Sequence, residues 1–326
     1  MKLIIQVPCY NEADTLGVTL KSLPRQVEGF DRVEWLVIDD GSSDNTAETA
    51  RSHGADHIVR FLKNQGLARA FTAGLEAGIK AGADVIVNTD ADNQYDARDI
   101  PRLVQPILSG QADMTVGVRA IAEIRHFSWL KKKLQKMGSW VVRRFSKTDI
   151  QDTTSGFRAV SRDAALKLNV FNDYTYTLET LIQGGQKNMV IQPVPIRVNP
   201  DLRPSRLVKS IFSYIKKSVA TIIRISIIYK PFRFFLTIGL SLFSLGLLIG
   251  LRFLYFYFGG EGQGHVQSLI LASILLGFGF QTILIAFISD LLATNRKLME
   301  DIQYRLKKIE HQEAQEGESD PPEPQT

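Results

Sequence analysis

The chain has 326 residues, of which 44% are hydrophobic, and a formal net charge of +5. This length exceeds one average domain, and the uneven distribution of the apolar residues excludes a protein that is soluble along its whole length. No nucleic-acid partner is predicted. The single cysteine, Cys9, cannot form an internal disulfide, which is typical of a reducing compartment.

The first 200 residues alternate between apolar strands and amphipathic helices. The predicted strands are Leu3–Pro8, Val33–Ile38, His57–Phe61, Val85–Asn88 and Met114–Val118, and the predicted helices are Thr15–Leu23, Asn45–His53, Leu67–Ala81 and Ile100–Leu108. This pattern indicates a doubly wound α/β fold with a mainly parallel sheet that is covered on both faces. Ligands of such sheets bind beyond the carboxyl ends of the strands, so the segments that follow the strands should carry the chemistry.

Asp90 and Asp92 follow the fourth predicted strand in the sequence TDADNQ, with Gln94 two residues further on. Two carboxylates one residue apart repel each other unless a positive charge or backbone donors lie nearby. Carboxylate and amide oxygens suit Mg²⁺ or Mn²⁺, and these ions commonly bridge a substrate diphosphate. We therefore predict a metal site here. The alternative is turn chemistry, which could be the whole role of Asp96 and Asp99.

The second predicted strand ends in the sequence VIDDGSSDNT. Asp39 and Asp40 close the strand, and Asp44 can cap the helix that begins near Asn45. A carboxylate at this place can accept hydrogen bonds from a nucleobase or a ribose. A capped turn explains Asp44 fully, but it explains Asp39 and Asp40 only in part.

The segments PCYNE, VIDDGSSD, TDADNQ and TSGFR, in this order, resemble family 2 glycosyltransferases with the GT-A fold. Within that family the chain looks most like polyprenyl- or dolichyl-phosphate hexose (mannose or glucose) synthases. The resemblance implies an inverting, metal-dependent transfer of one sugar to a membrane polyprenyl phosphate from a nucleotide-diphosphate sugar, either GDP-mannose or a UDP-hexose. A membrane scaffold that binds sugar nucleotides without turnover stays open, as does an enzyme with a hydroxyl acceptor. The QxxRW signature of processive synthases is missing, so long-polymer synthesis is not expected.

The resemblance also implies roles for residues on the donor side. Contacts with the nucleotide are assigned to Pro8, Tyr10, Glu12, Asp39 and Asp90. Binding of the Mg²⁺ or Mn²⁺ ion is assigned to Asp90, Asp92 and Gln94. Binding of the donor diphosphate is assigned to a basic loop that contains Arg203, Ser205 and Arg206.

On the acceptor side, the resemblance assigns the lipid phosphate to Arg119, which ends the fifth strand. Lys131 and Gln135 stand where the family has an Arg and a Ser, which keeps the charge but loses bidentate geometry. Asp152 matches a carboxylate near the acceptor, and Glu179 is a weaker candidate. A phosphate monoester is largely dianionic near neutral pH, so a strong base is less necessary. Asp152 is expected to be a catalytic residue that orients the acceptor, and a role as a base stays open.

Two apolar segments, Phe234–Phe258 and Val266–Ser289, carry one and no charged residue. Each exceeds the roughly 20 residues that a membrane-spanning helix needs. The connector between them lacks Lys and Arg, whereas both outer flanks are basic, which predicts cytoplasmic flanks. The apolar run at the N-terminus is shorter than the core of a signal peptide. We expect a multi-pass protein of the plasma or inner membrane, with the catalytic domain and both termini in the cytoplasm.

Two further segments are rich in cations. Residues 205–233 contain no carboxylate and are predicted to form an interfacial helix on anionic lipid. The segment Phe127–Phe145 fits either an interfacial helix or an ordinary helix packed on the sheet. The predicted domains are thus a GT-A domain (1–204), a basic interfacial helix (205–233), two spans (234–292) and a cytoplasmic helix with a disordered acidic tail (293–326).

The cytoplasmic helix has an apolar stripe, which suits packing on a partner or on the catalytic domain. The stripe consists of Leu298, Ile302, Leu306 and Ile309. A homo-oligomer that forms through the transmembrane or C-terminal helices also stays open.

Overall fold

The computed structural model describes residues 1–119, 150, 152–170, 176–200, 224, 227, 230–260 and 262–319. The chain divides into two compact units, Met1–Ile211 with Gln303–Thr326 and Phe212–Ile302. Some predicted residues lie outside the described part, namely Lys131, Gln135, Arg203, Ser205 and Arg206, together with the segment Phe127–Phe145 and most of 205–233.

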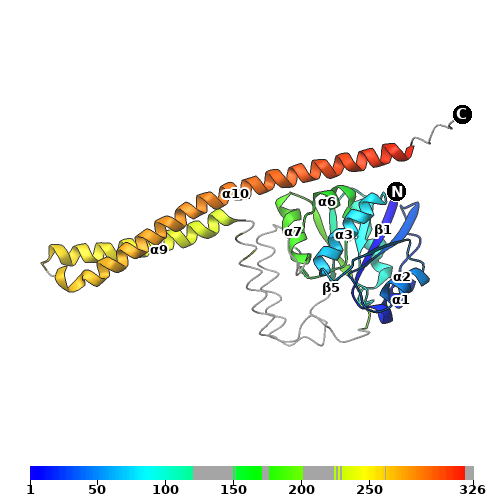
Figure 1. Cartoon of the computed structure of the whole chain (residues 1–326), viewed down its shortest axis with the longest axis horizontal. Coiled ribbons are helices and arrows are strands. Elements are labelled where there is room, and N and C mark those ends of the chain that lie inside the picture. The colour runs from blue at the N-terminus through cyan, green and yellow to red at the C-terminus, as the bar shows by residue number, and fades with distance from the viewer. Residues whose placement is uncertain are drawn as a thin grey trace. The chain divides into compact units, whose positions relative to one another are not determined.

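The first unit is built on a seven-stranded sheet in the order β3-β2-β1-β4-β6-β5-β7 (Figure 1). The strands are β1 Lys2–Cys9, β2 Arg32–Asp39, β3 His57–Arg60, β4 Val85–Asn88, β5 Met114–Arg119, β6 Arg158–Ser161 and β7 Ile191–Ile196. Strand β6 is antiparallel to β4 and β5, and the other pairs are parallel. The predicted α/β fold with a mainly parallel sheet is confirmed.

Helices cover both faces of this sheet. They are α1 Ala13–Ser22, α2 Thr46–Ser52, α3 Leu67–Lys80, α4 Ile100–Leu108 after the short η1 Ala97–Asp99, α6 Arg162–Lys167 and α7 Thr177–Gln186. The elements predicted within the first 119 residues are found at nearly the same positions. The sequence reasoning did not identify β6 and β7, which complete the sheet on either side of β5.

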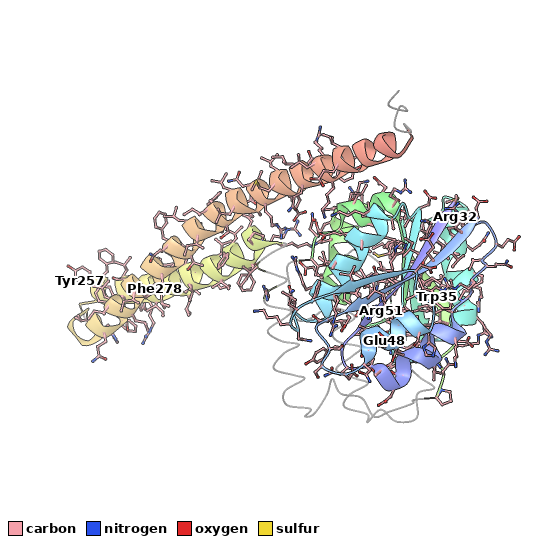
Figure 2. All side chains as sticks on the ribbon, turned by 45° about the vertical axis from the view of Figure 1, so that its right-hand side comes forward. Arg32, Trp35, Glu48, Arg51, Tyr257 and Phe278 are labelled. Carbon is pink, nitrogen blue, oxygen red and sulfur yellow. The ribbon has the colours of Figure 1, made fainter. Side chains whose placement is uncertain are left out.

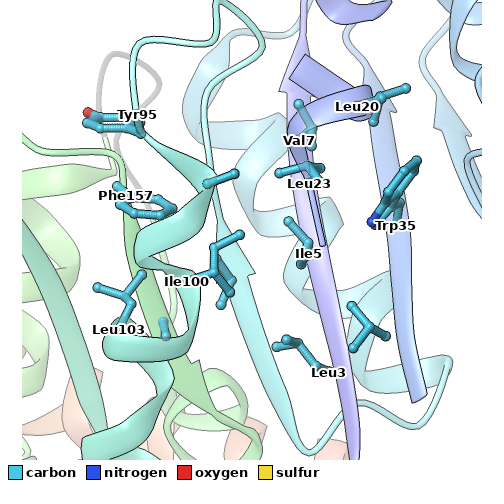
Figure 3. Packing of buried hydrophobic residues seen from close by; sticks show 14 of the residues in the cluster. Leu3, Ile5, Val7, Leu20, Leu23, Trp35, Tyr95, Ile100, Leu103 and Phe157 are labelled. Carbon is cyan, nitrogen blue, oxygen red and sulfur yellow. The ribbon is translucent and has the colours of Figure 1, made fainter. Parts of the chain in front are cut away.

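Side chains alternate between the two faces along each strand. On one face Leu3, Ile5 and Val7 of β1 belong to the buried cluster that includes α1 and α4 (Figure 3). On the other face α3 approaches the strands closely through two glycines. A Cβ atom on Gly78 would lie 2.8 Å from Cδ1 of Ile86, so no larger residue fits there without movement.

The chain order places a topological switch point beside β1. The chain runs from β1 outward to β2 and β3 and then returns to β4 on the opposite side of β1. Ligands of doubly wound sheets bind in the crevice at the carboxyl ends of the two strands at such a point. The switch point lies between the segments that follow Cys9 and Asn88, where the sequence places its polar motifs, and we call this rim of the sheet the crevice.

The second unit is a helical hairpin. It contains α9 Pro231–Phe258, the short η3 Gly262–His265 and the first part of α10 Val266–Ser319. Both helices are long and apolar enough to cross a membrane, with a mean hydropathy of 2.2 in their most apolar windows. Large apolar side chains project outward from them, including Tyr257 and Phe278, each 60% exposed (Figure 2). This is the pattern of a membrane protein.

Small residues bring the two hairpin helices into close contact. Gly239 and Gly246 of α9 are buried, and they face residues of α10 around Gly279 and Ala272. A Cβ atom on Gly279 would lie 2.6 Å from the backbone nitrogen of Phe243. Without a hydrophobic driving force between helices in lipid, such close backbone packing is a main source of attraction.

The C-terminal part of α10 belongs to the first unit, where it contacts the region of α6. The Tyr304 hydroxyl donates to Asp163 Oδ1 at 2.8 Å, and Lys307 Nζ donates to Asn169 Oδ1 at 3.3 Å. These contacts are polar. The residues of the predicted apolar stripe are all more than half exposed, so the stripe does not make them.

Candidate active site

The loops that follow β1 and β2 are bound to each other. The Asn11 backbone N–H donates to Ser42 Oγ at 2.9 Å, and the Ser43 N–H donates to Asn11 Oδ1 at 2.9 Å. Asn11 has a φ of 53°, a conformation that Asn tolerates better than most residues. The Glu12 N–H donates to Thr46 Oγ1 at 2.9 Å. The two loops therefore form one fixed edge of the crevice.

Asp39 and Asp40 have different surroundings although they are neighbours. Asp40 accepts hydrogen bonds from the backbone N–H groups of Gln65 at 2.7 Å and Gly66 at 2.9 Å, so it holds the turn before α3. Asp39 is fully buried, and its Oδ1 accepts from the Ser42 N–H at 2.8 Å. Its Oδ2 lies 3.1 Å from Arg60 Nε but has no partner with hydrogen-bond geometry. A buried acceptor of this kind is costly to leave unpaired, and it suits a donor group from a nucleotide.

The other residues predicted on the nucleotide side lie along the same edge. Pro8 is buried near the end of β1, and the Tyr10 side chain is 45% exposed. The Glu12 carboxylate accepts a hydrogen bond from Thr15 Oγ1 at 2.8 Å, which ties it to the first turn of α1. The structure therefore brings Pro8, Tyr10, Glu12 and Asp39 together, and Tyr10 is the most accessible of them.

The loop that follows β4, residues 89–96, carries the predicted metal ligands, and we call it the metal loop. Asp92 Oδ1 accepts the backbone N–H of Gln94 at 3.1 Å, which closes a tight turn. Asp90 packs directly against Gly156, where a Cβ atom would lie 2.8 Å from Asp90 Oδ1. The Tyr95 hydroxyl hydrogen-bonds to Asp90 and accepts the Gly156 N–H at 2.9 Å.

Tyr95 is held in place by the core beneath the loop. Its ring is buried and stacks on Phe157, with 5.1 Å between the ring centroids and 9° between the planes (Figure 3). Sequence reasoning missed both Tyr95 and Gly156. The position of Tyr95 directly after Gln94 was the available signal for the first, and TSGFR contained the second.

Burial and the charge of Asp92 raise the pKa of Asp90 to about 7, although Arg119 and Arg158 act in the opposite direction. The positive charges of Arg119 and Arg158 thus do not offset burial and the neighbouring carboxylate at Asp90, and a divalent cation would supply further positive charge there. Among the described residues, no group of three or more His, Cys, Asp or Glu side chains could hold a metal. Two carboxylates and an amide fit a cation that takes its remaining ligands from a substrate diphosphate and water.

Arg119 lies beside this loop and is paired with Asp152. Its Nε donates to Asp152 Oδ2 at 2.6 Å and its Nη2 to Oδ1 at 3.0 Å, which is a bidentate ion pair. Asp152 is fully buried, whereas 14% of the Arg119 side chain is exposed. The guanidinium also reaches Thr154 Oγ1 at 3.2 Å and Gln94 Oε1 at 3.5 Å. Arg119, which is predicted to bind the acceptor phosphate, therefore contacts the metal loop through Gln94.

Glu179 is the remaining carboxylate that the sequence singled out. Its side chain is buried on α7, where it accepts a hydrogen bond from Gln183 Nε2 at 3.4 Å. Nothing in its described contacts joins it to Asp90 or Arg119.

Comparisons with known proteins agree with this geometry. The model of the family "Glycosyl transferase family 2" matches residues 4–168. An undecaprenyl-phosphate mannosyltransferase of Micrococcus luteus is 29% identical over 206 residues, which cover 60% of this chain and 83% of the relative. The glycosyltransferase AglJ of Haloferax volcanii is 27% identical over 313 residues, which cover 92% of this chain and 96% of the relative.

A solved structure shows the same fold. It is glucosyl-3-phosphoglycerate synthase of Mycobacterium tuberculosis in complex with Mn²⁺, UDP and glucosyl-3-phosphoglycerate. The TM-score is 0.51 at 20% identity, and the match covers 69% of this chain and 78% of that chain. The family match spans half of the chain and includes the crevice loops. The protein is therefore a glycosyltransferase that belongs to glycosyl transferase family 2.

Proposed function

We propose that the protein transfers one hexose, with inversion, from a nucleotide-diphosphate sugar to a membrane polyprenyl phosphate and that it requires Mg²⁺ or Mn²⁺. The donor is GDP-mannose or a UDP-hexose. The observation that carries this proposal is the contact between the metal loop and Arg119 at one rim of the sheet. Under this proposal, a side chain that binds phosphate lies next to the cation that the donor diphosphate coordinates.

The residues of the crevice divide the work between them. Asp39 Oδ2 accepts a hydrogen bond from the nucleoside, and the exposed Tyr10 ring lies on the same side. Asp90, Asp92 and Gln94 hold the cation, which neutralises charge that develops on the leaving diphosphate. Arg203, Ser205 and Arg206 bind the same diphosphate. Arg119, with Lys131 and Gln135, binds the acceptor phosphate.

The surroundings of Asp152 favour a phosphate acceptor over a hydroxyl acceptor. A hydroxyl must lose its proton to a general base within hydrogen-bond reach. Both Asp152 oxygens already accept hydrogen bonds from Arg119, and Oδ1 also accepts from Thr154 Oγ1 at 3.0 Å. An acceptor phosphate needs no such base, because it is already largely ionised near neutral pH. Asp152 therefore orients Arg119.

The membrane arrangement follows the distribution of Lys and Arg. The catalytic domain, residues 1–204, lies in the cytoplasm and continues into a basic interfacial helix, residues 205–233. Two spans within residues 234–292 form a hairpin whose turn, which lacks Lys and Arg, faces outward, and residues 293–326 return to the cytoplasm. A sugar donor made in the cytoplasm and an acceptor held in the bilayer then meet at the same surface. The homo-oligomer stays a prediction.

The test is a donor and acceptor panel with the full chain purified in detergent. UDP- and GDP-sugars are offered with polyprenyl phosphate, with the dephosphorylated polyprenol, or with no acceptor, and nucleotide release is measured with and without chelator. We expect release for one donor only when polyprenyl phosphate and Mg²⁺ or Mn²⁺ are present. Asp92→Asn should abolish this release.

The matched control for this charge removal is Glu48→Gln on α2, which changes to an amide an exposed carboxylate whose ion-pair partner is Arg51 on the same helix. It should retain full activity. Equal release with polyprenol, or unchanged release in excess chelator, would show that the acceptor or the cation has been assigned incorrectly.

A further inference from the structure

A residue that is distant in the sequence supports the backbone of the metal loop. Asn199 follows β7, and its side-chain Nδ2 donates to the backbone carbonyls of Asn93 at 2.9 Å and Tyr95 at 3.3 Å. Its backbone N–H donates to the Gln94 carbonyl at 2.8 Å. Three consecutive carbonyls of the loop are thus bound by a single residue.

Part of this loop has an uncommon backbone conformation. Asn93 has a φ of 57°, in the left-handed region that non-glycine residues rarely occupy. Its neighbours Asp92 and Gln94 are the predicted ligands, so a change at Asn93 would redirect both. The carbonyl of Asn93 points to Asn199, and its side-chain Oδ1 accepts from Ser22 Oγ at 3.2 Å. This turn is therefore held on two sides.

The position of Asn199 is itself well anchored. The Arg197 N–H donates to Asp99 Oδ2 at 2.7 Å, and the Arg197 Nη2 atom donates to Asp99 Oδ1 at 2.7 Å. Val198 forms an isolated β-bridge with Tyr95. Asn199 thus projects from a segment that is tied to both ends of the short stretch Tyr95–Asp99, and it offers a rigid donor to the loop.

We propose that Asn199 is a positioning residue that holds Asp92 and Gln94 in the geometry required to bind the divalent cation. This inference rests on the proposed function, because it assumes the cation site at Asp90, Asp92 and Gln94. Asn199 does not touch the cation. Its amide fixes the loop carbonyls, and through them the directions in which the ligand side chains leave the backbone. Loss of a supporting contact of this kind typically weakens metal affinity 10- to 100-fold.

The experiment measures Mn²⁺ binding directly, by paramagnetic resonance of free Mn²⁺ and by calorimetry, on the full chain in detergent with UDP or GDP present. Asn199→Ala should bind Mn²⁺ about 10- to 100-fold more weakly. The affinity for UDP or GDP in the absence of metal and the melting temperature should both change little. In the transfer assay, excess Mn²⁺ should restore most of the rate, because the defect lies in cation affinity.

The matched control is Asn188→Ala. Asn188 makes the same Asn-to-Ala exchange possible at a residue that has a left-handed backbone like that of Asn93, with a φ of 55°, but that lies in an exposed turn before β7. It should lose some stability and keep its Mn²⁺ affinity. In Asn199→Ala, the metal-free affinity for UDP or GDP and the melting temperature could both fall while excess Mn²⁺ fails to restore the transfer rate. That result would show a merely structural role and overturn the proposal.

Asp92→Asn in the same titration separates the two levels of inference. If it abolishes Mn²⁺ binding while Asn199→Ala binds normally, the role of Asn199 is wrong and the proposed function stands. If Asp92→Asn also binds Mn²⁺ normally, the cation site itself is wrong, and both proposals are overturned.

Discussion

The Arg119 side chain is not an isolated cation, because it is paired with a carboxylate. Its guanidinium is held by Asp152 in a fork with two hydrogen bonds, and only a small part of the side chain is exposed. The sequence predicted a role for each of these residues but not their pairing. Such a pair fixes the plane of the guanidinium, so Arg119 can present its remaining donors in one direction only.

Arg119→Lys tests this alignment. An ammonium keeps the positive charge but cannot form the fork with Asp152 or clamp two phosphate oxygens. We expect normal affinity for the nucleotide sugar and a transfer rate to lipid phosphate that is lower by on the order of 100-fold. The measurements are donor affinity by calorimetry and the transfer rate as a function of acceptor concentration.

Arg102→Lys on α4 is the control, because it makes the same exchange at an exposed arginine whose nearest carboxylate oxygen is 3.7 Å away. Loss of donor binding in Arg119→Lys, with a normal dependence on acceptor, would place this guanidinium on the diphosphate side instead.

At the scale of elements, the strands that the sequence predicted alternate with amphipathic helices within the first 119 residues, and the two that it missed, β6 and β7, lie beyond that stretch. β6 begins with Arg158, whose side chain is fully buried and donates to the carbonyls of Ser155 and Thr177. A hydropathy pattern does not predict a strand that begins with a buried arginine, because charged residues are almost never buried unless such partners are present. β7 has the sequence IQPVPI, and its two prolines argue against a strand except at a sheet edge, which is where it lies.

The close approach of α9 and α10 yields a prediction for the hairpin. Gly279→Ala would place a methyl group 2.6 Å from the backbone nitrogen of Phe243, so the helices must separate. Overpacking of this kind typically costs about 1–3 kcal/mol. We expect unfolding of the full chain at a lower SDS fraction in mixed micelles. Gly277→Ala, two residues away, is the control, because nothing lies within 4 Å of its added methyl group. Equal unfolding midpoints for the two variants would contradict the observed packing.

For the whole molecule, the decisive prediction concerns the side of the membrane on which each part lies. Cys9 is the single native cysteine and is buried, so labelling of an added cysteine has little background. A cysteine at Gly264, whose Cβ would meet open space, should react with an impermeant thiol reagent applied to intact cells. A cysteine at the exposed Glu310 should react only after the cells are opened. The reverse pattern would place the catalytic domain outside, away from a cytoplasmic sugar donor.

The sequence predicted the location of the crevice because the carboxyl ends of parallel strands meet at one edge. Asp39, Asp90 and Arg119 each end a strand or follow it directly, so their convergence could be predicted without contacts. Asn199 could not be found in this way, because its partners are backbone carbonyls more than 100 positions away. Main-chain partners leave no pattern of side chains in the sequence, so such residues become visible only in the folded chain.

The pairing of Arg119 with Asp152 also means that a phosphate at the proposed acceptor site competes with a carboxylate for the guanidinium. The Asp152 carboxylate already neutralises the Arg119 guanidinium. An incoming phosphate must therefore either displace Asp152 from the guanidinium or share the guanidinium with it. Under the proposed reaction the substrate is largely a dianion, whereas the product is a phosphodiester with one negative charge. The dianion competes well against Asp152, and the diester competes poorly. Under the proposed reaction, Asp152 is therefore expected to act as a counter-ion of Arg119 that the substrate can displace and that helps to release the product once the sugar has been transferred.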